Sequence, residues 1–338
     1  MAAKKRSPRK AKPAHYVLVF MEGPGMIDRG TVAAIQRKLD VVIKTPRERT
    51  TIDIWLDSGG GDAHAAYKLG IDLRARASTL RAVVPDYAKS AATLLVLGMD
   101  EIYMGPSAEL GPLDVQVAHP DKETETVSGL DIADALEFLN ESALNLAIAG
   151  GAALVTYTQL PRAEVLGTTL KFMASFFRPV VAKLDPMIIH RAASQLRVAH
   201  HYAVRLMGAR GAAKDRELTT KLATSIVQNL VANYPTHGSI IDRIEARQNL
   251  KLPILDAETH PHWPLIKAVH RQQRGSTFIQ VWTEQDLEKL TSPTMNGAGP
   301  KVPKAGAPRP SPRAGAKNEK NKSQPKRAGN GAGSQARA

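Results

Sequence analysis

The hydrophobic pattern of the first hundred residues alternates between stretches typical of strands and stretches typical of helices. Tyr16–Met21 is a continuous apolar run of strand length, and Ile52–Leu56 is short, largely alternating and β-branched. Between them, apolar residues of Gly30–Ile43 recur at helical spacing. This alternation predicts βαβ units, an α/β fold and a mainly parallel sheet. Further strands are expected at Leu80–Val84 and Glu101–Met104, and further helices at Ala63–Ala77 and Ser90–Leu97.

The second half of the chain shows mainly helical patterns. Its most apolar stretch, Ala143–Tyr157, is shorter than a bilayer-spanning helix and contains Asn145 and a Gly pair. We therefore expect a buried helix there and no membrane span. The predicted helices are Leu130–Asn140, Ala143–Thr158, Leu166–Ala182, Met187–Met207, Lys214–Asn233 and Ile240–Asn249.

The positive charge is concentrated at the two ends of the chain. The formal net charge is +14, and residues 1–14 carry +6 while residues 297–338 carry +9, which leaves about −1 for the rest. Both ends are poor in apolar residues and rich in small and basic ones, so they are expected to be disordered. We predict a disordered basic tail at 1–14, one domain at 15–290 with a helical insertion around 130–230, and a second disordered basic tail at 291–338.

Two interpretations of the tails remain open. They either keep the protein soluble or make weak, salt-sensitive contacts with RNA, DNA or another polyanion. The chain has no cysteine, which excludes disulfides, thiol catalysis and cysteine-ligated zinc. No apolar signal-peptide segment is visible near the N-terminus. We expect a cytoplasmic protein.

A glycine-rich turn, Ser58-Gly59-Gly60-Gly61, follows the predicted strand Ile52–Leu56. It lacks the Lys-Ser/Thr of a P-loop and the spacing of a dinucleotide fingerprint, so nucleotide binding is unsupported. Glycines at the carboxyl end of a parallel strand let backbone N–H groups approach a ligand closely. The turn is therefore either purely structural or a source of backbone hydrogen-bond donors.

A serine opens the next predicted helix, in Tyr87-Ala88-Lys89-Ser90-Ala91-Ala92-Thr93. Ser90 is either a simple helix cap or a nucleophile beside free backbone N–H groups. The serine and the glycine turn, about thirty residues apart, can meet at the same edge of one sheet. The N–H groups of Gly60 or Gly61 and of Ala91 would then supply two donors for an acyl oxyanion.

A resemblance to a known family rests on four segments: Ile52–Gly61, Val84–Thr93, Asp100–Met104 and Leu110–Gln116. They look like the serine dehydrogenase proteinase family, which is similar to the Clp protease proteolytic subunit and to signal peptide peptidase A. A weaker likeness lies near Tyr234–Leu250.

The resemblance implies a ClpP/crotonase-like fold of repeated ββα and βαβ units, acting as a serine peptidase on a polypeptide substrate. It places Ser90 in the nucleophile position and Gly60, Gly61 and Ala91 in the oxyanion hole. By analogy with the family, we also expect a homo-oligomer.

The general base stays open among three residues. His237 falls near the segment that supplies the acidic triad member in the Clp subunit. His119 lies 29 residues after Ser90, close to where Clp-type enzymes place their histidine. Lys122 fits a Ser–Lys dyad of the signal-peptide-peptidase kind. Lys89 adjoins the serine, but adjacent side chains at a helix start usually diverge.

Asp114 either orients a base or caps a turn, and the turn interpretation is favoured. The histidines lack metal-ligand spacing, so we expect no metal and no organic cofactor. Two functions remain: a serine peptidase that hydrolyses amide bonds, or a catalytically inactive crotonase-like scaffold. The scaffold would bind nucleic acid or an acidic partner through its basic tails.

Overall fold

The computed structural model describes residues 13–23, 26–119, 122–210, 216–234 and 236–291. These residues belong to one compact unit. The two predicted basic tails fall almost entirely outside the described residues. Their disorder, and the domain boundaries drawn from it, therefore stay predictions.

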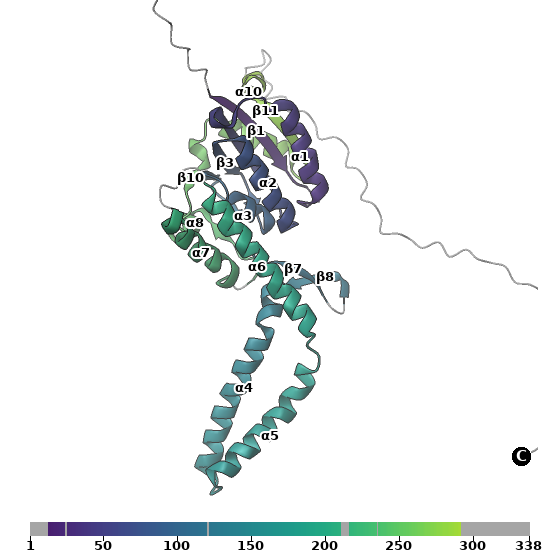
Figure 1. Cartoon of the computed structure of the whole chain (residues 1–338), viewed down its shortest axis with the longest axis vertical. Helices are drawn as coiled ribbons and strands as arrows, with labels where there is room; N and C mark the ends of the chain where they lie inside the picture. The colour runs from purple at the N-terminus through teal and green to yellow at the C-terminus, as the bar shows by residue number, and fades with distance from the viewer. Residues whose placement is uncertain (1–12, 24–25, 120–121, 211–215, 235, 292–338) are drawn as a thin grey trace, which may run out of the picture. The chain divides into compact units, whose positions relative to one another are not determined.

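Within the described residues, the core is built on a six-stranded sheet with the order β10-β5-β3-β2-β1-β11 (Figure 1). All neighbouring pairs are parallel except β1 and β11, which are antiparallel. The predicted α/β class with a mainly parallel sheet is confirmed. The strands are β1 (Ala14–Met21), β2 (Thr50–Asp57), β3 (Thr79–Val84), β5 (Glu101–Met104), β10 (Ile254–Asp256) and β11 (Phe278–Thr283).

Both faces of the sheet are covered, which explains why β1 has a continuous apolar run from Tyr16 to Met21. Leu18 and Ile54 lie on the face that packs against several helices. Val19 and Trp55, from the alternate positions, pack on the other face against α9 (Trp263–Gln273). The helices of this cluster include α1 (Arg29–Val42), α2 (Ala63–Arg76), α3 (Ala91–Val96) and α6 (Pro186–Gly208).

A second, three-stranded sheet joins segments that are distant in sequence. Its order is β4-β6-β9, with β4 (Tyr87–Ala88), β6 (Glu109–Leu110) and β9 (Ile241–Asp242). β4 pairs parallel with β6, and β6 pairs antiparallel with β9. The small sheet therefore brings residues near 90, 112 and 240 to one place. A hairpin, β7 (Gln116–His119) and β8 (Lys122–Ser128), follows β6.

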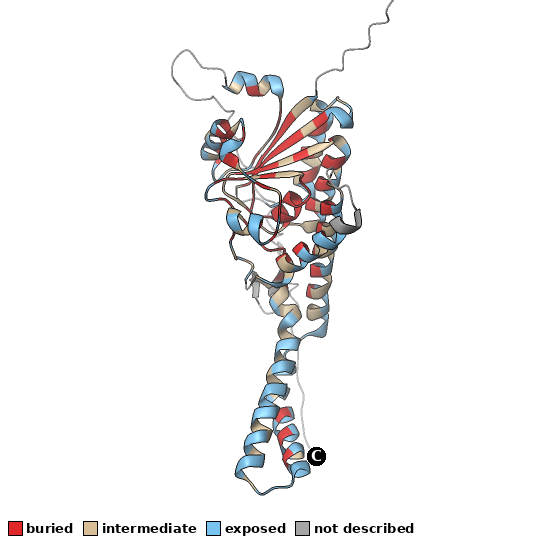
Figure 2. Ribbon diagram, turned by 90° about the vertical axis from the view of Figure 1, so that its left-hand side faces the viewer, coloured by how far each residue is buried: buried red, intermediate tan, exposed pale blue. Residues whose placement is uncertain are grey.

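The helical second half is confirmed, but the expected burial of Ala143–Tyr157 is wrong. This stretch belongs to one long helix, α4 (Gly129–Tyr157), which packs against α5 (Arg162–Val181) and α6 rather than against the sheet. Ile148 and Tyr157 are exposed, and Figure 2 shows α4 largely exposed along its length. Among the described residues, α4 is the one helix long and apolar enough to cross a membrane by length and composition. Hydropathy reports composition, whereas burial requires a neighbouring surface.

Three helices and two short turns complete the described part of the chain. The helices are α7 (Arg216–Ala232), α8 (Arg243–Gln248) and α10 (Glu284–Thr291). Two short 3-10 turns lie at Arg47–Arg49 and Ala257–Thr259.

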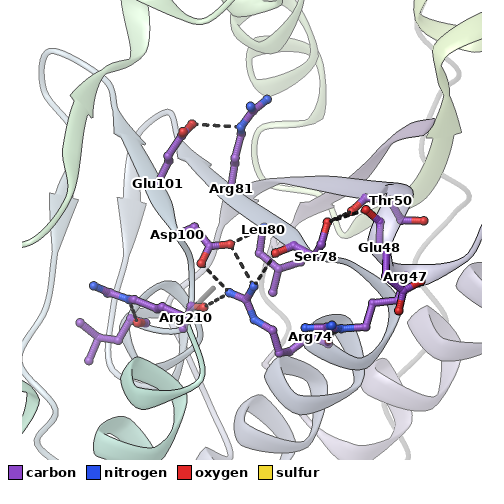
Figure 3. Close-up of polar contacts among 12 residues, drawn as sticks. Arg47, Glu48, Thr50, Arg74, Ser78, Leu80, Arg81, Asp100, Glu101 and Arg210 are labelled. Carbon is purple, nitrogen blue, oxygen red and sulfur yellow. Dashed lines mark hydrogen bonds and ion pairs between the residues drawn. The ribbon is translucent and has the colours of Figure 1, made fainter. Parts of the chain in front are cut away.

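A polar network at the amino-terminal ends of the strands ties down the ends of α2 and α6 (Figure 3). Arg74 donates two hydrogen bonds to Asp100, at 2.9 and 3.0 Å, and further bonds to the carbonyls of Gly98 and Ser78. Arg210, just beyond the end of α6, donates to the carbonyl of Leu97. The Arg74 bonds hold α2 to the segments that precede β3 and β5, and the Arg210 bond ties the end of α6 to the end of α3.

Candidate active site

The glycine turn adopts backbone conformations that require glycine. Gly60 has φ +105° and Gly61 has φ +142°, both in the region that favours glycine. A Cβ on Gly60 would lie 2.6 Å from the carbonyl oxygen of Lys89 and 3.0 Å from Cβ of Ser90. A Cβ on Gly61 would lie 2.5 Å from the carbonyl oxygen of Ile27. The turn is therefore pressed against the segment that carries the serine, as predicted from the sequence.

Ser90 occupies the turn between β4 and α3. Its backbone has φ 50° and ψ −117°, an uncommon conformation for a residue with a side chain. Although Ser90 stands at the N-cap position of α3, its side chain makes no capping hydrogen bond. The simple helix-cap interpretation is therefore wrong for the Ser90 hydroxyl. The strained backbone is typical of a functional site rather than of a cap.

Two backbone N–H groups near Ser90 are free to bind an anion. In the part of the chain that the structure describes, the N–H groups of Gly61 and Ala91 have no hydrogen-bond acceptor. The N–H of Gly60, in contrast, donates to Oγ of Ser58 at 3.0 Å. Of the three predicted oxyanion residues, Gly61 and Ala91 keep an available donor, and Gly60 shapes the turn.

The predicted base His237 lies beside Asp114. The Nδ1 atom of His237 is 3.6 Å from Oδ2 of Asp114, whose side chain is 4% exposed. The Oδ1 atom of Asp114 also accepts a hydrogen bond from the N–H of Leu130 at 3.1 Å. Burial alone would raise the pKa of Asp114, but the neighbouring His237, Ser128 and Leu130 together hold that pKa below its usual value. Asp114 thus accepts a hydrogen bond from the first turn of α4, as a capping residue would, and its other oxygen lies beside the ring of His237.

Ser90, Gly60, Gly61, Ala91 and His237 line one cavity of about 620 Å³, together with Asp114. The small sheet explains this meeting, because β4 precedes Ser90, β6 precedes Asp114 and β9 follows His237.

Among the side chains that it describes, the structure does not identify another general base. His119 and Lys122 lie on the hairpin β7–β8, and their side chains are outside the described part of the structure. Both residues stay predictions. Lys89 is engaged elsewhere, because its Nζ lies 2.9 Å from Oε1 of Glu109 and bonds the carbonyl of Ser239.

Several cavity residues were missed by the sequence analysis. His64, at the start of α2, lines the cavity, and its Nδ1 is 2.9 Å from the hydroxyl of Tyr202. One face of α6 supplies another wall of the cavity. The helical spacing of these residues was the only feature of the sequence that could have indicated them. Its residues are Arg191, Ser194, Gln195, Val198 and Ala199. Among the described residues, no group of three or more His, Cys, Asp or Glu side chains could hold a metal ion.

Comparison with known proteins agrees with the expected family over part of the chain. Residues 31–128 match the family of ClpP-like SDH-type serine proteinases, which confirms the resemblance for that segment. Two uncharacterized proteins of Methanocaldococcus jannaschii, MJ0137 and MJ1495, are 33% and 31% identical over 87 residues. The match spans 26% of this chain and 30% of the length of each relative.

Solved structures of proteases are distant neighbours. A membrane-bound stomatin-specific protease, 1510-N, is 19% identical with a TM-score of 0.29, covering 46% of this chain and 69% of that chain. ClpP1 from Listeria monocytogenes is 15% identical with a TM-score of 0.24, covering 45% of this chain and 78% of that chain.

Proposed function

We propose that this chain is a serine peptidase with Ser90 as its nucleophile. One observation carries the proposal: Ser90, two free backbone donors and a histidine–carboxylate pair line the same cavity. The family matched over residues 31–128 consists of serine proteinases, which supports the same chemistry.

The proposed reaction follows from these positions. Oγ of Ser90 attacks the substrate carbonyl, and its proton passes to His237, whose Nδ1 side faces Asp114. The N–H groups of Gly61 and Ala91 stabilise the oxyanion of the tetrahedral intermediate. The imidazolium then gives the proton to the leaving amine, and water hydrolyses the acyl-enzyme by the same steps.

The cavity also bears on the substrate. Leu94, Leu113, Val115 and Val198 give it apolar walls, which suit the side chain of a polypeptide better than a highly charged ligand. We extend the proposal to a polypeptide substrate, a homo-oligomeric state and a cytoplasmic location.

Hydrolysis of peptide and activated-ester substrates tests the function and identifies the base. Ser90→Ala should abolish turnover, and His237→Ala should lower kcat by on the order of a thousandfold or more. His64→Ala is the matched control. His64 lines the same cavity, but its ring is hydrogen-bonded to the Tyr202 hydroxyl and has no proposed role as the base. If Lys122→Ala or His119→Ala abolishes turnover and His237→Ala does not, the base is on the hairpin. Absence of turnover in the wild type would favour the inactive scaffold.

A further inference from the structure

Two buried polar side chains lie behind the glycine turn, outside the cavity. Glu22 directly follows β1 and is 5% exposed, and Ser58 directly follows β2 and is fully buried. Neither residue lines the cavity. Their burial is costly unless each polar atom finds a partner, so their contacts indicate what they do.

Ser58 connects three segments of the site. Its N–H donates to the carbonyl of Tyr87 at 3.1 Å, and its carbonyl accepts from the N–H of Lys89 at 3.0 Å. These bonds fix the backbone of Ser58 to the strand that leads into the nucleophile. Its side-chain Oγ accepts the N–H of Gly60 at 3.0 Å and also bonds Oε2 of Glu22.

The direction of these bonds is determined by their chemistry. The amide of Gly60 can only donate, so the oxygen of Ser58 must accept there. The single hydroxyl proton of Ser58 is then left for Glu22, whose carboxyl oxygen accepts it. A hydroxyl without a fixed acceptor rotates, so Glu22 is the group that keeps the lone pair of Ser58 aimed at Gly60.

The glycine turn leaves little room for a change in this arrangement. An added Cβ on Gly60 would lie 3.1 Å from the amide nitrogen of Ala91, so the turn and the second donor are in close contact. The Gly61 N–H belongs to the next peptide unit, whose Gly60 carbonyl accepts a hydrogen bond from the N–H of Ile27 at 2.8 Å. A rotation of the Gly60 amide would therefore reach the Gly61 N–H through the φ and ψ angles of Gly60 and change its direction relative to Ala91. Oxyanion stabilisation depends on donors held to fractions of an ångström.

We propose that Glu22 and Ser58 are positioning residues of the oxyanion hole: Glu22 orients the Ser58 hydroxyl, which holds the Gly60 amide and so aims the Gly61 N–H. This inference rests on the proposed function, because it assumes that Ser90 attacks a carbonyl held at these donors. It adds two residues that touch neither substrate nor nucleophile and act through the turn.

Labelling of the full chain with a fluorophosphonate probe, followed over probe concentration, tests the inference. Ser58→Ala and Glu22→Leu should each lower the maximal labelling rate by about tenfold, less than the loss caused by deleting an oxyanion donor itself. The probe concentration for half-maximal labelling should not change. Glu22→Gln keeps an acceptor and should label at nearly the wild-type rate. Ser78→Ala, which removes a hydroxyl at the opposite end of the strands, should label like the wild type.

Because Glu22 is proposed to act through Ser58, the combined variant should label no more slowly than Ser58→Ala alone. Hydrogen exchange of the Gly60 amide, which needs no catalysis, should accelerate in Ser58→Ala and in Glu22→Leu but not in Glu22→Gln. Thermal unfolding of each variant checks that the chain is folded. If Ser58→Ala is too unstable to assay, the labelling rates of Glu22→Leu and Glu22→Gln decide whether the inference holds.

The inference is overturned if folded Ser58→Ala or Glu22→Leu labels at the wild-type rate, or if their losses multiply in the combined variant. It is also overturned if Glu22→Gln loses as much as Glu22→Leu. Failure of the proposed function is a different result, because then the wild-type protein itself is not labelled.

Discussion

Replacing Glu22 by glutamine should make the stability of the protein less dependent on pH. Burial raises the pKa of Glu22 from 4.5 to about 7; the hydrogen bond from Ser58 opposes this rise, and the charges of Asp28 and Asp57 add to it. The buried carboxyl is therefore protonated in the folded protein at pH values where it is ionised in the unfolded chain.

The sign and size of the effect follow from this difference. The contribution of Glu22 to the free energy of unfolding is fully present below pH 4.5 and is lost as the pH rises through about 7. A separation of about 2.5 between the two pKa values corresponds to about 3 kcal/mol. Glutamine cannot ionise, so this loss should be absent in the variant.

Urea unfolding of the wild type and of Glu22→Gln at pH values from 4 to 8.5 measures the effect. The free energy of unfolding of the variant should rise relative to that of the wild type by about 3 kcal/mol across this range. The same substitution at the exposed Glu48 provides the control for removing a negative charge. A difference between wild type and Glu22→Gln that stays constant with pH would refute the reasoning.

Substitutions at two other places test the turn and the polar network. Gly60→Ala should cost at least about 1–3 kcal/mol of stability, because its Cβ meets the Lys89 carbonyl at positive φ, and should slow labelling of the protein. Gly59→Ala is its control, because nothing lies within 4 Å of that Cβ; equal effects of the two would contradict the geometry. Arg74→Ala should cost about 3–5 kcal/mol in urea unfolding, since it removes both hydrogen bonds that the Arg74 guanidinium donates to the Asp100 carboxylate. A loss below about 1 kcal/mol would mean that the pair contributes little.

The parallel sheet and the meeting of Gly60 with Ser90 were predictable because they depend on local pattern. Strand signals, helix signals and a glycine turn are each short, continuous stretches of the sequence, and parallel strands bring their carboxyl ends to one edge. Gly60 has a positive φ because the turn packs directly against the segment that carries Ser90.

The contact of Asp114 with His237 was not predictable in the same way. It depends on β4, β6 and β9 pairing across more than a hundred residues, and each of these strands has two residues. Such short strands have no periodicity to detect. The sequence therefore left Asp114 as a turn residue and the base undecided.

The exposure of α4 shows a different limit. Its apolar composition predicted burial, yet Ile148 and Tyr157 are exposed, because the helix packs mainly against α5 and α6 and these leave part of its surface uncovered. The apolar content of a helix indicates that another surface will cover it, but it does not identify that surface.

The most direct test of the proposed peptidase is to locate the adduct of a fluorophosphonate probe by peptide mass spectrometry. The proposal predicts a single adduct on Ser90 in the wild type and none in Ser90→Ala. An adduct on another residue, or labelling that survives Ser90→Ala, would contradict the assignment of Ser90 as the nucleophile.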